Sequence, residues 1–225
     1  MNLSTYEFSA VHLHGDELRG QRVLEVGAQS YNGGLRPFVM SRDPAEYVGV
    51  DISPGPGVDL VCDIADLEKR FGADSFDVVL CTEVLEHVRP WRDAIRNLKA
   101  VCRPGGFILL TTRSPGFPYH AYPHDYWRFD LGDFERIWSD FGIDTLESDP
   151  LAPGVYVKAH KPEHFVEADL SDLAVYCLPA GERALEVREE HLRSAHFRRL
   201  RWRDRLQRAL TSIKAALFGK LTTSS

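Results

Sequence analysis

RVLEVGAQSYNGG, residues 22–34, combines a short apolar run with three glycines. The run at residues 23–26 is typical of a parallel strand that is buried on both faces. Gly27 then allows the backbone to turn sharply and a ligand to approach the main chain. The two later glycines allow a second close approach just before residues 35–40, an apolar segment that can begin a helix. A strand, a glycine turn and a helix N-terminus together predict a nucleotide-binding cradle.

Three further apolar runs follow, and acidic residues come directly after each of them. The first, residues 47–50, ends at Asp51, which lies 24 residues after Gly27. An acid at the tip of the second strand is placed to accept hydrogen bonds from two ribose hydroxyls, although it could also cap the next segment. The other two runs are residues 60–62, followed by Asp63, and residues 76–81, followed by TEVLEHV.

These pieces resemble the class I S-adenosylmethionine-dependent methyltransferases, in the type 11 methyltransferase-domain group. Six matches cover about residues 20–112 in the family's order: VLEVG at 23–27, VGVD at 48–51, CDI at 62–64, FDVV at 76–79, EVLEHV at 83–88 and RPGG at 103–106. One match alone is weak, but six in order are specific, because each marks the end of a strand or the turn into one. The family usually has a second glycine where Gln29 stands here, so the loop should be longer or differently shaped.

The resemblance implies S-adenosyl-L-methionine as the cofactor and a set of residues that hold it. Glu25 would accept hydrogen bonds near the amino-acid part of the cofactor, or would only order the turn, and Gly27 is needed in either case. Asp63 would meet the adenine amino group, with a plain turn aspartate as an equal alternative. The remaining implied cofactor-binding residues are Asp51, Ile52, Ile64 and Glu83.

Composition narrows the class of protein. The chain has 225 residues, 44% of them hydrophobic, which suits one α/β domain with a modest extension. Its four cysteines are widely spaced and are expected to be reduced core residues of a cytoplasmic protein. No signal peptide or membrane-spanning segment is expected. Residues 182–225 carry 11 Lys and Arg against 5 Asp and Glu, a net charge of +6. Because the whole chain has a net charge of −6, residues 1–181 have a net charge of −12. Such an acidic domain is not expected to bind nucleic acid.

The alternation of elements predicts an α/β fold, a Rossmann-like, doubly wound and mostly parallel sheet. Residues 1–20 should form an N-terminal cap, and residues 21–161 the cofactor-binding domain. Helices are expected at residues 65–71, 91–102 and 130–141, and the last two strands at 143–146 and 155–159. The resemblance implies seven strands, with the seventh antiparallel.

Residues 113–130 fit neither a helical nor a strand period. They hold three prolines and many aromatic residues, and they leave the carboxyl end of the fifth strand, where open α/β sheets bind ligands. We therefore expect a loop that forms a substrate lid. Its PHDYWRF segment, residues 123–129, resembles one branch of the methyltransferase group that acts in sugar, antibiotic and surface-polysaccharide pathways.

Three histidines are candidates for a catalytic base that deprotonates an acceptor. His124 or His120 on the predicted lid is the first choice, and His87 after the fourth strand is the second. For each, the alternative is a structural role in which the side chain only fixes its loop. No metal site is expected, because the spacing of His120, His124 and Asp125 is not a standard ligand spacing.

Residues 162–225 should form a C-terminal extension with a long charged helix over 182–221. One face would carry Trp202, Leu206, Ala209, Leu210, Ile213 and Leu217, and six arginines lie between Arg198 and Arg208. The helix could be a solvated surface element, an interfacial helix on anionic lipid, or a surface for self-association.

These observations predict a cytoplasmic methyltransferase that moves a methyl group to an oxygen or nitrogen of a small molecule, for example a sugar, an antibiotic or another secondary metabolite. Two alternatives stay open. One is an enzyme of the same fold that binds the cofactor but runs another reaction. The other is a non-catalytic module that works through its basic C-terminal helix.

Overall fold

The computed structural model describes residues 3–30 and 34–222, with side chains as far as residue 211. The first half of the chain folds into α1 (Leu3–His12), α2 (Gly15–Leu18), β1 (Arg22–Val26), α3 (Arg36–Met40), β2 (Glu46–Asp51), β3 (Leu60–Val61), the 3-10 helix η1 (Ile64–Asp66), α4 (Leu67–Phe71), β4 (Phe76–Thr82), the 3-10 helix η2 (Leu85–His87), α5 (Trp91–Val101) and β5 (Cys102–Arg113). The second half adds β6 (Trp127–Arg128), α6 (Leu131–Ile137), β7 (Gly142–Ser148), β8 (Gly154–His160), β9 (Val175–Cys177), β10 (Glu182–Ala184), α7 (Glu189–Arg193) and α8 (Ala195–Thr222).

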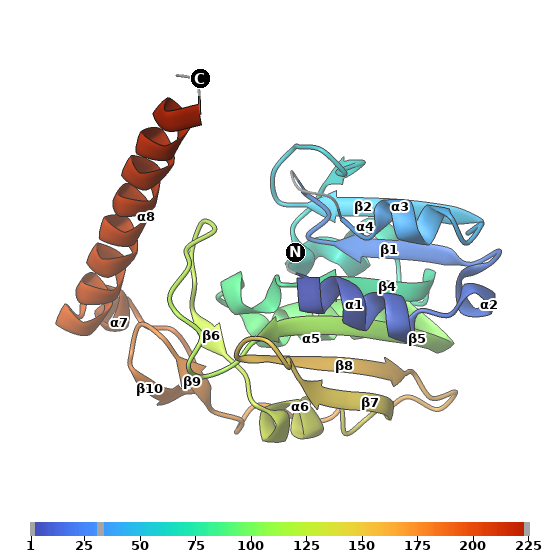
Figure 1. Ribbon diagram of the computed structural model, residues 1–225. Helices are drawn as coiled ribbons and strands as arrows, with labels where there is room; N and C mark the ends of the chain where they lie inside the picture. The colour runs from blue at the N-terminus through green and yellow to red at the C-terminus, as the bar shows by residue number, and fades with distance from the viewer. Residues whose placement is uncertain (1–2, 31–33, 223–225) are drawn as a thin grey trace.

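A seven-stranded sheet in the order β3-β2-β1-β4-β5-β8-β7 forms the centre of the molecule (Figure 1). β3, β2, β1, β4 and β5 pair in parallel, whereas β8 is antiparallel to both of its neighbours. The predicted doubly wound fold with an antiparallel last strand is therefore confirmed. Because β1, β2, β4 and β5 run in the same direction, their carboxyl ends meet at one edge of the sheet, where such folds bind ligands.

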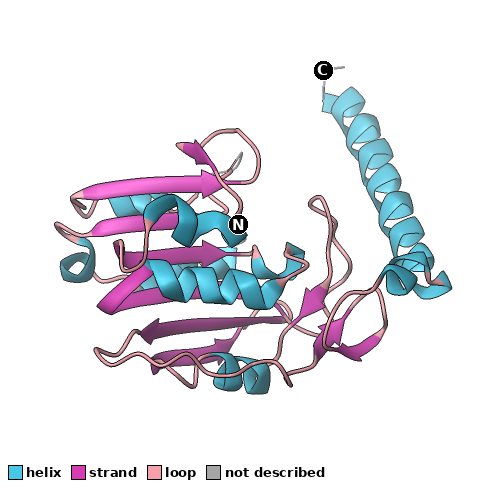
Figure 2. Cartoon of the chain, turned by 180° about the vertical axis from the view of Figure 1, so that it is seen from behind, coloured by secondary structure: helices cyan, strands magenta, loops and turns pink. Residues whose placement is uncertain are grey.

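Helices cover both faces of this sheet, which explains the continuous apolar runs of its strands. On one face α1, α2 and α3 pack on a core that includes Val23, Val78 and Leu80. On the other face α4, α5 and α6 pack on a larger core that includes Leu24 and Val79. Figures 1 and 2 show the two layers from opposite sides. Neighbouring residues of one strand thus belong to different cores, as the alternation of side chains along a strand requires.

Several predicted boundaries were wrong. The helix expected at residues 130–141 ends at Ile137, and turns lead to β7. The extension is not a helix from residue 182, because residues 182–184 form β10, which pairs with β9. β9 in turn pairs with β6, so the end of the predicted lid belongs to a small sheet. Strands of two or three residues are too short to produce a periodic pattern, and only their tertiary pairing defines them.

The long helix α8 begins at Ala195 and extends away from the domain in both views (Figures 1 and 2). Its first turns are held to the body: Phe197 is buried and packs edge-on against Tyr119. Farther along, Trp202, Leu206 and Leu210 are exposed, and the predicted positions Ile213 and Leu217 lie outside the described side chains. Among the described residues, no helix has the length and apolar character needed to cross a bilayer.

Candidate functional site

The turn after β1 depends on Gly27, which has φ of +79°, in the left-handed region. Its N–H donates to the carbonyl of Val50 at 2.9 Å, so the turn is fixed to the end of β2. A Cβ atom at this position would lie 2.2 Å from Cγ2 of Val84, in the loop after β4. The ends of three neighbouring strands therefore meet at this one glycine, and no side chain fits there.

Gln29, which replaces the usual second glycine, has a structural partner of its own. Its side-chain nitrogen donates to the carbonyl of Pro54 at 3.0 Å, in the loop after β2. A Cβ atom on Gly55 would lie 2.3 Å from that nitrogen, so the glycine gives the Gln29 side chain room. The glutamine that replaces the family's second glycine is thus accommodated by the proline- and glycine-rich loop at residues 53–57.

Asp51 lies at the end of β2, beside the glycine turn. Its two carboxylate oxygens accept from the backbone N–H groups of Gln29 at 3.2 Å and Ser53 at 3.1 Å. These contacts hold the carboxylate at the carboxyl edge of the sheet while leaving further acceptor positions on both oxygens. The neighbouring Ile52 is 55% exposed, so its side chain can cover a bound ligand.

Glu25 is buried under the same turn and accepts a hydrogen bond from the hydroxyl of Tyr47. Burial raises the pKa of this carboxyl to about 7, against the opposing effect of the Arg36 guanidinium. The group therefore carries less than a full negative charge near neutral pH in the absence of a cationic partner.

Glu25→Gln is expected to remove a pH-dependent part of the stability of the cofactor-free protein. A carboxyl whose pKa is about 7 when folded, against an ordinary value of 4.5, stabilises the folded state most below pH 4.5 and loses that contribution as the pH rises through 7. Between pH 4.5 and 8 the wild type should lose about 2–3 kcal/mol relative to the variant. Urea unfolding of both proteins across this range measures the difference, and parallel curves would contradict the expectation.

Asp63 and Ile64 lie farther along the same edge. The Asp63 carboxylate is exposed and accepts from the N–H of Ala65 at 2.9 Å, which caps η1. Ile64 is buried in the larger core, with 3% of its surface exposed. Asp63 thus has the local role expected of a turn aspartate, with its carboxylate still open to solvent. Contact of either residue with the adenine stays a prediction.

Glu83 follows β4 with φ of +59°, a backbone conformation that is costly for a residue with a side chain. Its carboxylate pairs with Arg113 at the end of β5 and accepts from the hydroxyl of Thr111 at 3.1 Å. Burial and the nearby Glu86 raise its pKa to about 7, although Arg113 opposes this. A strained residue held by this many contacts keeps the loop after β4 in one conformation.

Glu86, His87 and His120 converge beside Glu83. The Glu86 side chain is fully buried, and its Oε1 lies 3.7 Å from Nε2 of His87 and 3.7 Å from Nε2 of His120. Its Oε2 accepts from the hydroxyl of Thr112 at 2.7 Å. Two predicted catalytic histidines thus meet a glutamate that the sequence placed only beside His87.

The second half of the predicted lid, residues 125–129, packs beside this cluster and contacts His120 through Asp125. All five residues are buried. The Tyr126 N–H donates to the carbonyl of Glu86 at 2.9 Å, and the Trp127 indole donates to the carbonyl of Val88 at 3.1 Å. This half is therefore a packed part of the domain and is not a free lid.

His120 and His124 have different surroundings. Nδ1 of His120 lies 3.0 Å from Oδ2 of Asp125. Burial by itself would lower the pKa of His120, but the carboxylates of Asp125 and Glu86 raise this pKa to about 9. His124 is exposed, its ring lies against Tyr126, and only its backbone carbonyl reaches the cluster, at 2.5 Å from Nδ1 of His87. The ring of the residue first favoured as the base therefore lies apart from the cluster.

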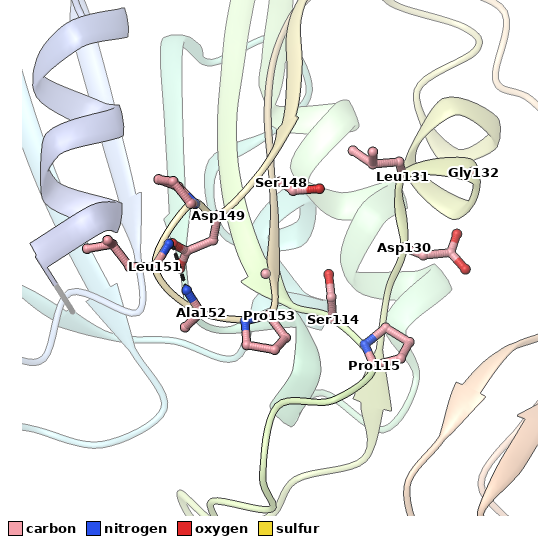
Figure 3. Close-up of a pocket in the computed structure, with 12 residues that line it drawn as sticks. Ser114, Pro115, Asp130, Leu131, Gly132, Ser148, Asp149, Leu151, Ala152 and Pro153 are labelled. Atoms are coloured by element: carbon pink, nitrogen blue, oxygen red, sulfur yellow. Dashed lines mark hydrogen bonds between the residues drawn. The ribbon is translucent and has the colours of Figure 1, made fainter.

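A hollow of about 830 Å³ lies next to this site at the same edge of the sheet (Figure 3). The side chains of Ser114, Leu131 and Ser148 face one another across it. Asp149 lines it and lies 3.5 Å from the guanidinium of Arg113, which also pairs with Glu83. Sequence reasoning missed Arg113, Asp149 and the hollow, because these residues come from segments that only the folded sheet brings together.

Comparison with known proteins identifies the family. A family model described as "Methyltransferase domain" matches residues 8–148, which is more than half of the chain. The chain therefore belongs to this family and is a class I S-adenosylmethionine-dependent methyltransferase. The resemblance inferred from the sequence, the enzyme class and the cofactor are thereby confirmed.

Two curated relatives illustrate the similarity. The chain is 31% identical over 125 residues to phthiotriol/phenolphthiotriol dimycocerosates methyltransferase 1 of Mycobacterium ulcerans, over 51% of this chain and 44% of the relative. It is 29% identical over 177 residues to the ubiquinone biosynthesis O-methyltransferase of Azoarcus sp., over 73% of this chain and 65% of the relative. The matched part spans about half the length of several such relatives.

Solved structures share the fold. The 1,6-didemethyltoxoflavin-N1-methyltransferase of Burkholderia thailandensis, bound to 1,6-didemethyltoxoflavin and S-adenosylhomocysteine, superimposes with a TM-score of 0.58 at 18% identity, over 71% of this chain and 79% of that one. An S-adenosylmethionine-dependent methyltransferase from Mesorhizobium loti gives a TM-score of 0.53 at 17% identity, over 71% and 99% of the two chains.

Proposed function

We propose that this methyltransferase transfers the methyl group to a hydroxyl oxygen of a small molecule. The observation that carries the proposal is the convergence of Glu86, His87 and His120 at the carboxyl edge of the sheet, where His120 is placed to favour a deprotonated acceptor. The name of the Azoarcus relative, an O-methyltransferase, supports the choice of oxygen. We propose the acceptor only as a class of compound, a small hydroxyl-bearing metabolite such as a sugar or an antibiotic.

The cofactor fits the turn after β1. The left-handed Gly27 keeps this turn free of side chains, Asp51 faces it with spare acceptor capacity, and the buried Glu25 lies beneath it. We assign the ribose hydroxyls to Asp51 and the amino-acid part to the side of Glu25. Ile52 and Ile64 would flank the adenine ring, and Asp63 would accept a hydrogen bond from the adenine amino group. Glu83 would hold the loop that passes below the methyl-bearing sulfur. When bound, the cofactor supplies an electrophilic methyl group on a sulfonium.

The chain's own residues would position the acceptor and remove its proton. With a pKa of about 9, His120 is protonated at neutral pH and stabilises negative charge on the acceptor oxygen. His87 is then the histidine of the cluster that can take the proton, at Nε2, because its Nδ1 faces the carbonyl of His124. The bound cofactor would supply the methyl group and a thioether leaving group, and these residues would hold the acceptor oxygen and take its proton.

Turnover with matched acceptors tests the choice of oxygen. Pairs of phenols and anilines, and of alcohols and amines, that differ only in the accepting atom would be incubated with S-adenosylmethionine, and S-adenosylhomocysteine formation measured. We expect product from hydroxyl acceptors and at least about tenfold less from the amines, because a protonated His120 stabilises the negative charge that develops on a hydroxyl oxygen, whereas a neutral amine develops none. Faster turnover of the amines would overturn the proposal in favour of nitrogen.

The exposed face of α8 stays a proposed contact surface, for an anionic membrane or for a second copy of the chain. Trp202, Leu206 and Leu210 are exposed beside a run of arginines, a combination that suits either contact. Sedimentation with anionic vesicles and sedimentation velocity in their absence would distinguish the two. Family membership favours an enzyme over the alternative of a non-catalytic module.

A further inference from the structure

We propose that Glu86, His87 and His120 form a binding site for one divalent first-row transition-metal ion. Oε1 of Glu86 and a ring nitrogen of each histidine all lie within 4.8 Å of one another. Two imidazoles and one carboxylate are a donor set that suits zinc, iron or cobalt and leaves coordination positions open, whereas magnesium and calcium prefer oxygen donors. The spacing that argued against a metal was that of His120, His124 and Asp125, and only His120 of these belongs to this set.

The first argument is an unsatisfied buried oxygen. Glu86 is fully buried, and its Oε1 has no hydrogen-bond partner. The two histidine nitrogens lie 3.7 Å from this oxygen, beyond a good hydrogen bond. A buried carboxylate oxygen left without a partner is costly, and a cation between the three side chains would satisfy it.

The second argument is that the outer polar atom of each of the three side chains faces a polar group on the side away from the cluster. Glu86 Oε2 accepts from Thr112 at 2.7 Å. Nδ1 of His87 lies 2.5 Å from the carbonyl of His124, and Nδ1 of His120 lies 3.0 Å from Oδ2 of Asp125. These outer groups favour a proton on Nδ1 of each ring and leave Nε2 facing Glu86, as carbonyl and carboxylate partners do for metal-bound histidines.

The distances are compatible with an ion. Two ligand atoms at about 2.1 Å from a tetrahedral zinc lie about 3.4 Å apart. The two 3.7 Å separations from Glu86 would need to close by a few tenths of an ångström. The two histidine nitrogens lie within 4.8 Å of each other and would have to approach by turning of the rings. The His120 side chain is one-third exposed, so the site can be reached from solvent.

For the chemistry, this inference rests on the proposed function. An acceptor hydroxyl in an open position of the ion would lose its proton more readily, because the ion stabilises the oxygen anion, and the proton would pass to water. His87 and His120 would then both be ligands through a deprotonated Nε2, and the ion would replace His87 as the promoter of deprotonation and the protonated His120 as the positive charge. Metal binding itself can be measured without any substrate or cofactor.

Titration of untagged, chelator-stripped and dialysed protein with Co²⁺, followed by visible absorption, tests the site, with Zn²⁺ added as a competitor. We expect one equivalent to bind with a Kd in the micromolar range or below and Zn²⁺ to displace it. Glu86→Gln, His87→Asn and His120→Asn should each weaken binding by at least about a hundredfold. His124→Asn is the matched control and should bind like the wild type, because only its backbone carbonyl contacts the cluster.

Two further readouts separate folding and function from metal binding. Glu86→Gln keeps an acceptor for Thr112 and should keep its circular dichroism and its affinity for S-adenosylmethionine, while losing the rise in Tm that Zn²⁺ gives the wild type. Substoichiometric Co²⁺ binding by the wild type, or equal binding by all four variants, would overturn the site. If the ion binds as expected but hydroxyl acceptors are not turned over, the metal site stands and the proposed function fails.

Discussion

Gly27→Ala is expected to weaken S-adenosylmethionine binding by about a hundredfold to a thousandfold. The left-handed φ of +79° costs a residue with a Cβ about 1–2 kcal/mol. The new methyl group would also lie 2.2 Å from Cγ2 of Val84, and relief of such overpacking costs about 1–3 kcal/mol. Movement of Val84 would displace the loop that carries Glu83, Glu86 and His87, so the turn and the cluster would be disturbed together.

Calorimetric titration with S-adenosylmethionine and S-adenosylhomocysteine measures this loss. Gly20→Ala is the matched control, because Gly20 has φ of +71° with nothing within 4 Å of its Cβ position, so it tests backbone strain alone. Val84→Ala should restore part of the affinity in the double variant, since the next contact would be an ordinary 3.6 Å. Wild-type affinity in Gly27→Ala would show that the turn does not hold the cofactor. The same titration of Asp51→Ala tests the ribose contact.

Arg128→Met is expected to destabilise the fold by about 3–5 kcal/mol. The Arg128 side chain is fully buried and donates to both carboxylate oxygens of Asp125, at 2.6 Å and 2.7 Å. It also donates to the carbonyls of Phe117 at 3.2 Å and Pro118 at 2.9 Å. Methionine would fill much of the space but would remove the donors to Oδ1 of Asp125 and to two carbonyls, and would leave the buried carboxylate with His120 alone.

Thermal and urea unfolding measure the effect, and Tm should fall by about 6–20 °C for a chain of this size. Arg96→Met is the control: its pair with Asp93, at 3.0 Å, is exposed and should contribute less than about 1 kcal/mol. Adding Asp125→Asn to Arg128→Met should recover part of the loss, because the buried charge is then removed. A single-variant loss no larger than that of Arg96→Met would show that the pair does not hold the loop. Since Asp125 also positions His120, the destabilised variant should bind Co²⁺ more weakly as well.

The local sequence was sufficient for the fold and for the edge of the sheet where we propose that the cofactor binds. Apolar runs predicted strands buried on both faces, and the motifs at their ends predicted the edge where Gly27, Glu25 and Asp51 meet. These features are local: a strand, its following turn and the acid at its tip lie within a few residues of one another, and parallel pairing then aligns their ends. The same reasoning failed for β6, β9 and β10, which have only two or three residues each and are defined by their pairing. β6 pairs with β9 across about 50 positions of the chain, and β10 pairs back onto β9.

The side of the site that we propose to be catalytic was decided by tertiary structure. The sequence marked His124 or His120 as the first candidate and His87 as the second, because nothing local shows which of the three rings faces the site. The burial of Asp125 through Phe129 turns the His120 ring toward Glu86 and leaves the His124 ring outside. Residue type and order along the chain therefore determined that this protein binds a nucleotide-like cofactor at the end of a parallel sheet. Which side chains face the acceptor, and with what charge, depends on long-range packing and desolvation, which act only between segments that the fold brings together.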